Sequence, residues 1–385
     1  MTKTEEKYVT LHLQKQVARK RKTRLRPAKQ NNKKMEIIAF DSFKGCITSS
    51  EAGEAFAQGR RAKGHETCVL AMSDGGDGML DAFLPVMGGH KITVNCHDAL
   101  MRHITACYGM SADTAIIEVA QACGLSLIEP EQRNALRATS YGLGELIADA
   151  VAHGAHHMVI GLGGTATSDC GMGMLKALLD RLGKHNEDSI DGVLERCFKG
   201  ISVTLASDVT NPLYGPEGAA HVFARQKGAT DEQIEQIDRR AKRFADISAR
   251  HCGYDRSACA GAGAAGGLGY AFMQFMNAKM ASGAELLLKW CHFDELLAHA
   301  DMVFTGEGHS DRQTLMGKLP GVLLRHAQQA GVKVCLLSGG VSDKDELLKA
   351  GFYKVESINE PDMPLQEAMK PEVAKARLAA WNGLS

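Results

Sequence analysis

The sequence predicts an α/β protein with two α/β domains, one of which is inserted into the other. At both ends of the chain, short apolar runs without alternation precede helical segments, a pattern typical of a parallel sheet covered on both faces. In the middle, from residue 81 to residue 285, close-spaced strands without helices between them indicate a mixed sheet. With 385 residues, 44% of them hydrophobic, the chain can form two cores.

The first domain begins with a buried strand, "MEIIAF" (35–40). Ser49 or Ser50 is expected to cap the following helix, which ends at Gly64. A second strand at 66–72 and a helix from about Met79 complete a βαβ unit.

The C-terminal region, 286–385, repeats this rhythm and is expected to complete the same parallel sheet as residues 35–80. The predicted elements are strands at 301–306 and 333–340 and helices at 319–331, 343–351 and 363–380.

The inserted domain, residues 81–285, starts with the three close-spaced strands. These are 90–96, 103–110 and 114–120; a helix near 140–153, a strand at 156–162, a helix from about Cys170 and a strand at 201–207 follow. The uncharged window 257–278 contains several glycines, so we expect it to be buried in the protein rather than to span a membrane.

The formal net charge is zero, but residues 1–34 contain twelve Lys and Arg against two Glu. This basic segment fits a nucleic-acid arm, a targeting sequence, or residues upstream of a translation start at Met35. The eleven cysteines form no C-x-x-C pair, which predicts reduced thiols and a cytoplasmic protein.

Polar and glycine-rich loops follow several predicted strands, where open parallel sheets bind ligands. The loops are "FDSFKG", "SDGGDG", "GLGGTATSD", "ASDVTNP" and "TGEGHSD". They contain carboxylates, while lysines stand close to glycines. Carboxylates, lysines and backbone N–H groups are what phosphoryl transfer with Mg²⁺ requires. The candidates are Asp41, Asp74, Asp77, Asp169, Asp208, Glu307 and Asp311, with Lys44, Lys227 and Lys318.

Other interpretations of these loops stay open. A single Asp at a strand end is commonly a helix cap, and glycine turns often serve tight geometry alone. No Walker A motif is present. Gly161–Ala166 fits G-x-G-x-x-A and Gly261–Gly266 fits G-x-G-x-x-G, which keeps an NAD(P)-dependent oxidoreductase as an alternative, although the expected downstream acid is absent.

From Met35 to about residue 380, the chain resembles the glycerate kinase family of the bacterial glycerate 2-kinase type. The motifs that carry the resemblance are "AFDSFKGCITSSEAGEAFAQG", "SDGGDGM", "GLGGTATSDCGMGML", "ASDVTNPLYGPEGAAHVFARQKGA", "GAGAAGGLG" and "GEGHSDRQTLMGKLPGVL". The resemblance implies a discontinuous flavodoxin-like domain and an inserted restriction-endonuclease-like domain. It also implies ATP and Mg²⁺ as cofactors and the conversion of D-glycerate to 2-phosphoglycerate, with the 3-phosphate as the alternative product.

For such a reaction we assign Asp208 as the first choice of general base, Asp169 as the second, and Lys44 as a cation that neutralises phosphate charge. The two domains are expected to form a cleft that closes on the substrates. Expected cofactor-binding residues are Gly161, Gly163, Gly164, Thr165, Asp41, Ser42, Lys227, Gly306, Gln313 and Lys318; expected metal ligands are Glu307, Asp311 and Asp74.

Two departures from the family pattern bear on activity. Asp77 stands where the family usually has Glu, and His309 where it usually has Arg, which predicts weaker anion binding unless Arg312 replaces the missing guanidinium. A non-catalytic sugar-acid sensor whose basic arm contacts nucleic acid is therefore the competing class. A small-molecule substrate, no membrane partner and a homodimer complete the expectations.

Overall fold

The computed structural model describes residues 35–43, 45–73, 75–76, 78–184 and 189–383, which form two compact units. Unit 1 contains three stretches: the chain up to Ser73, Asp81–Gly89 and the chain from Leu287. Unit 2 contains the short stretch between Ser73 and Asp81 and the long stretch His90–Leu286. The sequence placed the junctions after residues 80 and 285. The main difference is helix α3 (Met79–Met87), most of which belongs to unit 1. There Phe83 meets the ring of Trp290 edge-on, with centroids 4.9 Å apart.

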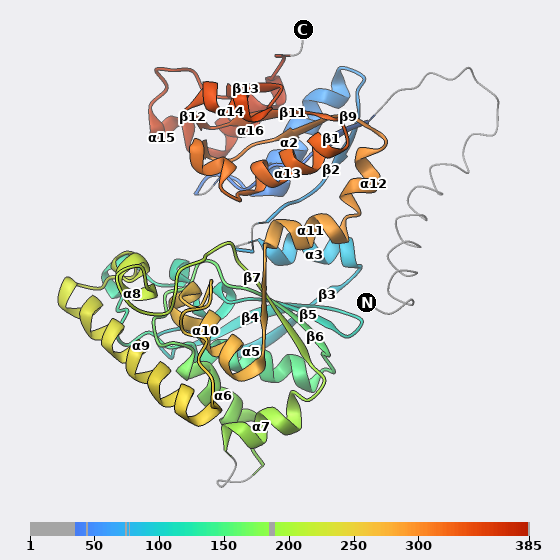
Figure 1. Cartoon of the computed structure of the whole chain (residues 1–385). Helices are drawn as coiled ribbons and strands as arrows, with labels where there is room; N and C mark the ends of the chain where they lie inside the picture. The colour runs from blue at the N-terminus through green and yellow to red at the C-terminus, as the bar shows by residue number, and fades with distance from the viewer. Residues whose placement is uncertain (1–34, 44, 74, 77, 185–188, 384–385) are drawn as a thin grey trace. The chain divides into compact units, whose positions relative to one another are not determined.

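Unit 1 is built on a parallel sheet with strand order β13-β11-β9-β1-β2 (Figure 1). Its strands are β1 (Met35–Ile38), β2 (Glu66–Val69), β9 (Ala300–Thr305), β11 (Lys333–Ser338) and β13 (Lys354–Ser357). Because β1 pairs with β9, the two ends of the chain contribute to one sheet, as the sequence predicted. The edge strand β13 was not predicted. In addition, β10 (His309–Ser310) pairs with β12 (Gly340–Val341).

The helices of this part of the chain differ from the prediction in two details. They are α2 (Ser49–Ala62), α3, α11 (Gly283–Trp290), α12 (Phe293–Leu297), α13 (Leu319–Gln329), α14 (Lys344–Ala350), α15 (Leu365–Ala368) and α16 (Pro371–Ala380). Thr48, not Ser49 or Ser50, caps α2, because Ser49 Oγ donates to the carbonyl of Phe40 instead. The expected single helix at 363–380 is divided at Pro371, which has no N–H to donate to a preceding turn and starts α16.

Aromatic packing joins α2 and α16 to the sheet of unit 1. Phe56 of α2 lies against Phe304 of β9 with ring centroids 4.7 Å apart, and Trp381, directly after α16, packs on both rings. Phe56, Phe304 and Ile38 belong to one buried cluster, and Trp381 packs against it, so the two helices cover the sheet with a close-packed core.

Unit 2 is built on a mixed sheet with strand order β3-β4-β5-β6-β7-β8, as predicted (Figure 1). The strands are β3 (His90–His97), β4 (His103–Ser111), β5 (Thr114–Glu118), β6 (His157–Gly161), β7 (Ser202–Ala206) and β8 (Lys279–Ala281). The pairs β3–β4 and β4–β5 are antiparallel, and the pairs β5–β6, β6–β7 and β7–β8 are parallel. In the parallel part Glu118, Gly161 and Ala206 are register partners, so three strands end side by side.

The helices of unit 2 surround this sheet. They are α4 (Ala120–Cys123), α5 (Tyr141–Ala152), α6 (Met172–Leu182), α7 (Ile190–Cys197), α8 (Ala219–Phe223), α9 (Asp231–Cys252) and α10 (Ala264–Met276). The long helix α9 was not predicted, although its capping box of Thr230 and Gln233 is visible in the sequence. The uncharged window 257–278 contains α10, most of which is buried, as predicted.

Two expectations from composition also bear on the structure. None of the helices that the structure describes combines the length and apolar character needed to span a bilayer. All eleven cysteines are free, as the absence of C-x-x-C pairs predicted.

Candidate active site

In unit 2, loops with candidate residues leave the aligned ends of β5, β6 and β7. Glu118 ends β5 and is buried, while residues 162–171 follow β6. Asp208 lies two residues beyond the end of β7 and is exposed. The carboxyl edge of this sheet therefore presents a carboxylate to solvent beside the glycine-rich loop.

The glycines at 161 and 163 make room for another stretch of backbone. A Cβ on Gly161 would lie 2.6 Å from the carbonyl oxygen of Gly75, and a Cβ on Gly163 would lie 2.5 Å from Cα of Gly76. The N–H of Gly163 also donates to the Gly75 carbonyl at 3.4 Å. Gly164 differs, because it is exposed and has a φ of 70°. The glycine pattern predicted that another group approaches the backbone closely here. At 161 and 163 that group is the protein's own backbone.

The Asp169 carboxylate is surrounded by hydrogen-bond donors. Oδ2 accepts from the N–H of Ser140 (2.8 Å) and of Gly173 (3.1 Å), and from the hydroxyls of Ser140 (2.9 Å) and Thr139 (3.3 Å). Oδ1 accepts from the N–H of Gly171 at 3.1 Å. These bonds tie the start of α6 to the start of α5. They leave the second candidate base engaged with the protein backbone.

Two polar residues complete the interior of the loop. Thr165 is buried, and its hydroxyl reaches both the Cys123 carbonyl (3.3 Å) and the Thr167 hydroxyl (3.0 Å). Burial raises the pKa of the Cys170 thiol to about 12, and the Asp169 charge adds to this rise. Cys170 is therefore a neutral side chain near pH 7 and not a nucleophile.

Lys227 contacts the same loop from the segment before α9. Its ammonium group is buried, with 3% of the residue exposed, and donates to the Thr167 carbonyl at 2.6 Å. Burial lowers the pKa of Lys227 to about 8, and the nearby Asp169 charge opposes this shift. A cation is thus held against the loop that follows β6.

The second glycine cluster, 261–267, packs against this loop as well. A Cβ on Gly266 would lie 2.0 Å from the Thr167 carbonyl, and Gly266 has a φ of 66°. The Gly266 carbonyl accepts from the N–H of Cys170 at 3.1 Å. The G-x-G-x-x-G pattern here is therefore used for packing between loops and does not open a dinucleotide-binding βαβ unit.

In unit 1, the loops after β1 and β9 meet beside strand β11 at Gly306. The N–H of Asp41 donates to the Gly306 carbonyl at 2.8 Å, and a Cβ at 306 would lie only 1.6 Å from the Leu337 carbonyl. Asp41 is buried, and one of its oxygens accepts from the N–H of Ser42 at 2.7 Å. Only glycine can stand at 306 without moving β11.

Glu307 is the centre of a buried polar cluster. Oε1 accepts from the hydroxyls of Thr314 (2.7 Å) and Ser310 (3.1 Å), and Ser310 Oγ is 2.7 Å from Ser338 Oγ. Oε2 faces the Lys318 ammonium group at 3.3 Å, and the Lys318 side chain is 39% exposed. The cluster thus joins a buried carboxylate to a cation that reaches solvent.

The other predicted residues of this region lie around a short 3₁₀ helix, η4 (Arg312–Leu315). Asp311 caps η4 by accepting from the N–H of Gln313 at 2.8 Å, and the Gln313 side chain is exposed. His309 Nε2 is 3.0 Å from Ser342 Oγ. The Arg312 side chain is 70% exposed and forms an ion pair with Glu346 at 2.7 Å, so it is engaged on α14.

Lys44, Asp74 and Asp77 lie outside the described residues. Elsewhere in the described chain, no three His, Cys, Asp or Glu side chains gather as a metal-binding group. Mg²⁺ in kinases is commonly held by one or two carboxylates together with substrate oxygens, so a larger cluster is not needed.

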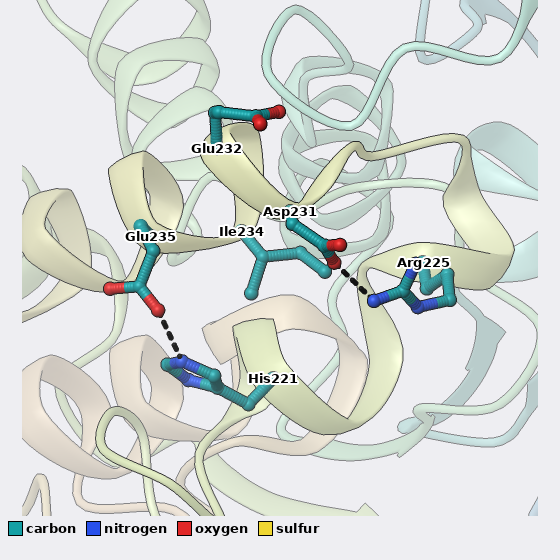
Figure 2. Close-up of a pocket in the computed structure, with 6 residues that line it drawn as sticks. All are labelled: His221, Arg225, Asp231, Glu232, Ile234 and Glu235. Carbon is teal, nitrogen blue, oxygen red and sulfur yellow. Dashed lines mark hydrogen bonds and ion pairs between the residues drawn. The ribbon is translucent and has the colours of Figure 1, made fainter.

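Figure 2 shows a separate pocket of about 410 Å³ between α8 and α9, which has no predicted residue among those that line it. Four of its charged side chains are paired: Arg225 with Asp231, and His221 with Glu235 at 3.1 Å. The fifth, Glu232, accepts from the Thr230 hydroxyl, and we assign this pocket no ligand.

Sequence reasoning missed several residues that hold these loops. Glu118 accepts from the N–H of Leu80 at 2.6 Å, and Arg240 of α9 donates to the Ser168 carbonyl at 2.7 Å. Thr314 and Ser338 belong to the Glu307 cluster. Only Glu118 carried a signal in the sequence, as a charge at the end of an apolar strand.

Comparison with known proteins identifies the family. The model of the glycerate kinase family matches residues 36–382. A glycerate kinase of Halalkalibacterium halodurans is 36% identical over 365 residues, covering 90% of this chain and 96% of that protein. A glycerate 2-kinase of Escherichia coli is 34% identical over 325 residues, covering 80% of this chain and 85% of that protein.

A solved structure agrees with the sequence comparison. A crystal structure from Salmonella typhimurium LT2, assigned as glycerate kinase 2, superposes with a TM-score of 0.75 at 34% identity, covering 90% of this chain and 95% of that one. The α/β class predicted from the sequence is thereby confirmed. The chain belongs to the glycerate kinase family, a family of kinases.

Proposed function

We propose that this protein transfers the γ-phosphoryl group of ATP to the C2 hydroxyl of D-glycerate and releases 2-phospho-D-glycerate and ADP. The observation that carries the proposal is the family match over residues 36–382, together with a relative named glycerate 2-kinase that is 34% identical. Phosphorylation at C3 is the competing outcome, and identification of the product decides between them.

Asp208 is our proposed general base. Its exposure two residues after a parallel strand supports this role, whereas the Asp169 oxygens are engaged by five donor groups. In the proposed step, the C2 oxygen of glycerate forms a bond to the γ-phosphorus while its proton passes to Asp208. The bond from the γ-phosphorus to the bridging oxygen breaks, and ADP leaves with that electron pair.

Three lysines are proposed to offset phosphate charge. Lys318 reaches solvent beside Glu307, which supports contact with a nucleotide phosphate. Lys227 is buried against the loop that contains Thr165, so its charge acts through that loop. Lys44 keeps the role predicted from the sequence. The predicted nucleotide contacts of Gly161, Gly163, Gly164, Asp41, Ser42, Gly306 and Gln313 also remain part of the proposal.

Mg²⁺ fits the residue types present at the end of β9. Glu307 and Asp311 are oxygen donors on one loop, and Asp74 is the third predicted ligand. When bound, the ion would neutralise charge on the transferring phosphoryl group. Binding the ion would not cost the Glu307 carboxylate any hydrogen bond to the backbone, because its partners are hydroxyls and an ammonium group.

The test is an ADP-release assay with ATP, Mg²⁺ and D-glycerate, with L-glycerate as the control substrate. Proton-coupled ³¹P NMR identifies the product, because a phosphate on C2 couples to one proton and a phosphate on C3 couples to two. A doublet supports the proposal, a triplet makes the enzyme a 3-kinase, and no ADP release refutes the proposed function.

Location and assembly are part of the same proposal. Use of ATP and eleven free thiols support a cytoplasmic enzyme. The homodimer stays a prediction, which light scattering after gel filtration would test.

A further inference from the structure

Two cationic side chains hold two consecutive carbonyl groups of the loop after β6. Lys227 donates to the Thr167 carbonyl at 2.6 Å, and Arg240 donates to the Ser168 carbonyl at 2.7 Å. Arg240 also donates to the Leu136 carbonyl at 3.2 Å, which links the loop to the segment before α5. Both cations act on carbonyls of the main chain, so their effect is on backbone orientation.

Fixing these carbonyls fixes the N–H groups of the same peptide units. In a trans peptide the N–H points opposite to the preceding C=O, and none of the described peptide bonds is cis. The N–H groups of Ser168 and Asp169 are therefore turned away from the two cations. Neither N–H has an acceptor among the residues that the structure describes, although Ser168 is 3% exposed and Asp169 is 6% exposed.

Buried backbone N–H groups without an acceptor are rare in native proteins and need an explanation. Two successive backbone N–H groups favour an anionic oxygen as the missing acceptor, and Lys227 and Arg240 offset the nearby negative charges of Asp169 and Asp238. The Arg240 Nε atom is buried and has no partner, so the charge-assisted bonds of this guanidinium to the Ser168 and Leu136 carbonyls are made in partly desolvated surroundings, where such bonds are strong.

We propose that Arg240 is a positioning residue, and that the N–H groups of Ser168 and Asp169 receive an anionic oxygen of a substrate. This inference rests on the proposed function and deepens it. The oxygen belongs to a carboxylate or a phosphate, so it comes either from D-glycerate or from the nucleotide. Arg240 touches neither substrate; it orients the peptide units that do.

The experiment compares Arg240→Ala with Arg239→Ala, a neighbouring arginine that is exposed on the same helix. For Arg240→Ala we expect the KM of one substrate, D-glycerate or MgATP, to rise about tenfold or more, while the other KM stays within twofold. Which KM rises identifies the source of the anion. Arg239→Ala should match wild type, and Arg240→Lys, which keeps the charge but not the planar fork, should lie in between.

Loss of stability alone would lower the amount of active enzyme and leave both KM values unchanged. Two KM values within twofold of wild type, or an equal rise of both, would therefore overturn the inference. If Arg240→Ala does not fold, Arg240→Lys and Arg240→Gln are judged by the same criterion.

Failure of the proposed function is recognised separately. If the wild-type protein does not phosphorylate D-glycerate, the proposed function fails, and the inference is decided by calorimetric binding of D-glycerate and of ADP. Selective loss of one affinity in Arg240→Ala supports it. The inference is overturned if Arg240→Ala binds both ligands with the same affinity as wild type, or if the wild-type protein binds neither ligand.

Discussion

Asp169 in unit 2 and Glu307 in unit 1 both follow a parallel strand, and both are buried, but their partners differ. Asp169 accepts three main-chain N–H groups and two hydroxyls, whereas Glu307 accepts two side-chain hydroxyls and an ammonium group. Main-chain donors are fixed by the fold. Hydroxyls rotate, and the Lys318 ammonium group reaches solvent, so Glu307 can exchange partners at a smaller cost.

The difference gives a criterion for reading acidic residues at strand ends. A carboxylate saturated by backbone N–H groups holds loops together, and one with movable partners is available to a ligand. By this criterion Asp169 supports the loop after β6, while Glu307 remains a candidate for the reaction. Asp208 remains a candidate because it is exposed.

The largest expected effect is on stability, at Asp169. In Asp169→Asn an NH₂ group replaces one carboxylate oxygen, so the N–H and hydroxyl groups that donated to that oxygen lose their acceptor. Each buried group left without a partner costs about 1–3 kcal/mol. We expect the free energy of unfolding of unit 2 to fall by about 4 kcal/mol, measured by urea denaturation.

Asp180→Asn, on an exposed face of α6, is the control and should change stability by less than about 1 kcal/mol. A stable Asp169→Asn enzyme with kcat reduced by orders of magnitude would instead make Asp169 the base.

Asp208 should show the opposite pattern. If it is the general base, Asp208→Asn lowers kcat by about 100-fold, equivalent to about 2.7 kcal/mol, without a matching loss of stability. Asp246→Asn, an exposed aspartate on α9, is the control for kcat. A kcat within threefold of wild type removes Asp208 from the role of base.

How far the sequence could predict these roles depended on distance along the chain. The strand at 35–38 and the helix at 319–329 follow from local apolar patterns and a proline at the helix start. The short, charged strand Lys354–Ser357 has no such pattern and was missed. The glycines at 161 and 163 predicted a close approach, but not that its partner is the backbone at 75–76.

The roles of individual charges were harder to predict for the same reason. Asp169 accepts two hydrogen bonds from Ser140, which lies 29 residues away in sequence, and Arg240 acts on Ser168 from 72 residues away. These contacts depend on how α5 and α9 pack, which one sequence does not reveal. The family motifs place the candidate residues in loops that follow strands, but they do not distinguish residues that support a loop from residues that could face a ligand.

Lys227 supports the loop after β6 and is also a predicted nucleotide-binding residue. Its burial predicts that the stability of the fold depends on pH. Burial lowers its pKa in the folded protein to about 8, from an ordinary 10.5. Between these values the unfolded chain holds a proton that the folded chain lacks, so stability rises with pH. Relative to Lys227→Met, the wild-type free energy of unfolding should increase by about 1.4 kcal/mol per pH unit at most between pH 8 and 10.5.

Urea denaturation at several pH values measures this difference, with Lys242→Met, an exposed lysine of α9, as the control. A constant difference between wild type and Lys227→Met across this window would mean that Lys227 stays protonated in the fold and that its charge is fully available to the loop.

The smallest expected effect is at Arg312, which the sequence offered as a substitute for the arginine usually found at 309. Its guanidinium pairs with Glu346, and exposed ion pairs contribute about 0–1 kcal/mol. We expect Arg312→Ala to leave the KM of both substrates within about twofold and to lower stability by about 0.5 kcal/mol. Glu346→Ala should have the same small effect, and the double variant should add nothing further. A tenfold rise in one KM for Arg312→Ala, but not for Glu346→Ala, would mean that Arg312 leaves its partner to bind a substrate. The cluster around Glu307 would then include a second movable cation, and the contrast with the fixed cations around Asp169 would be stronger.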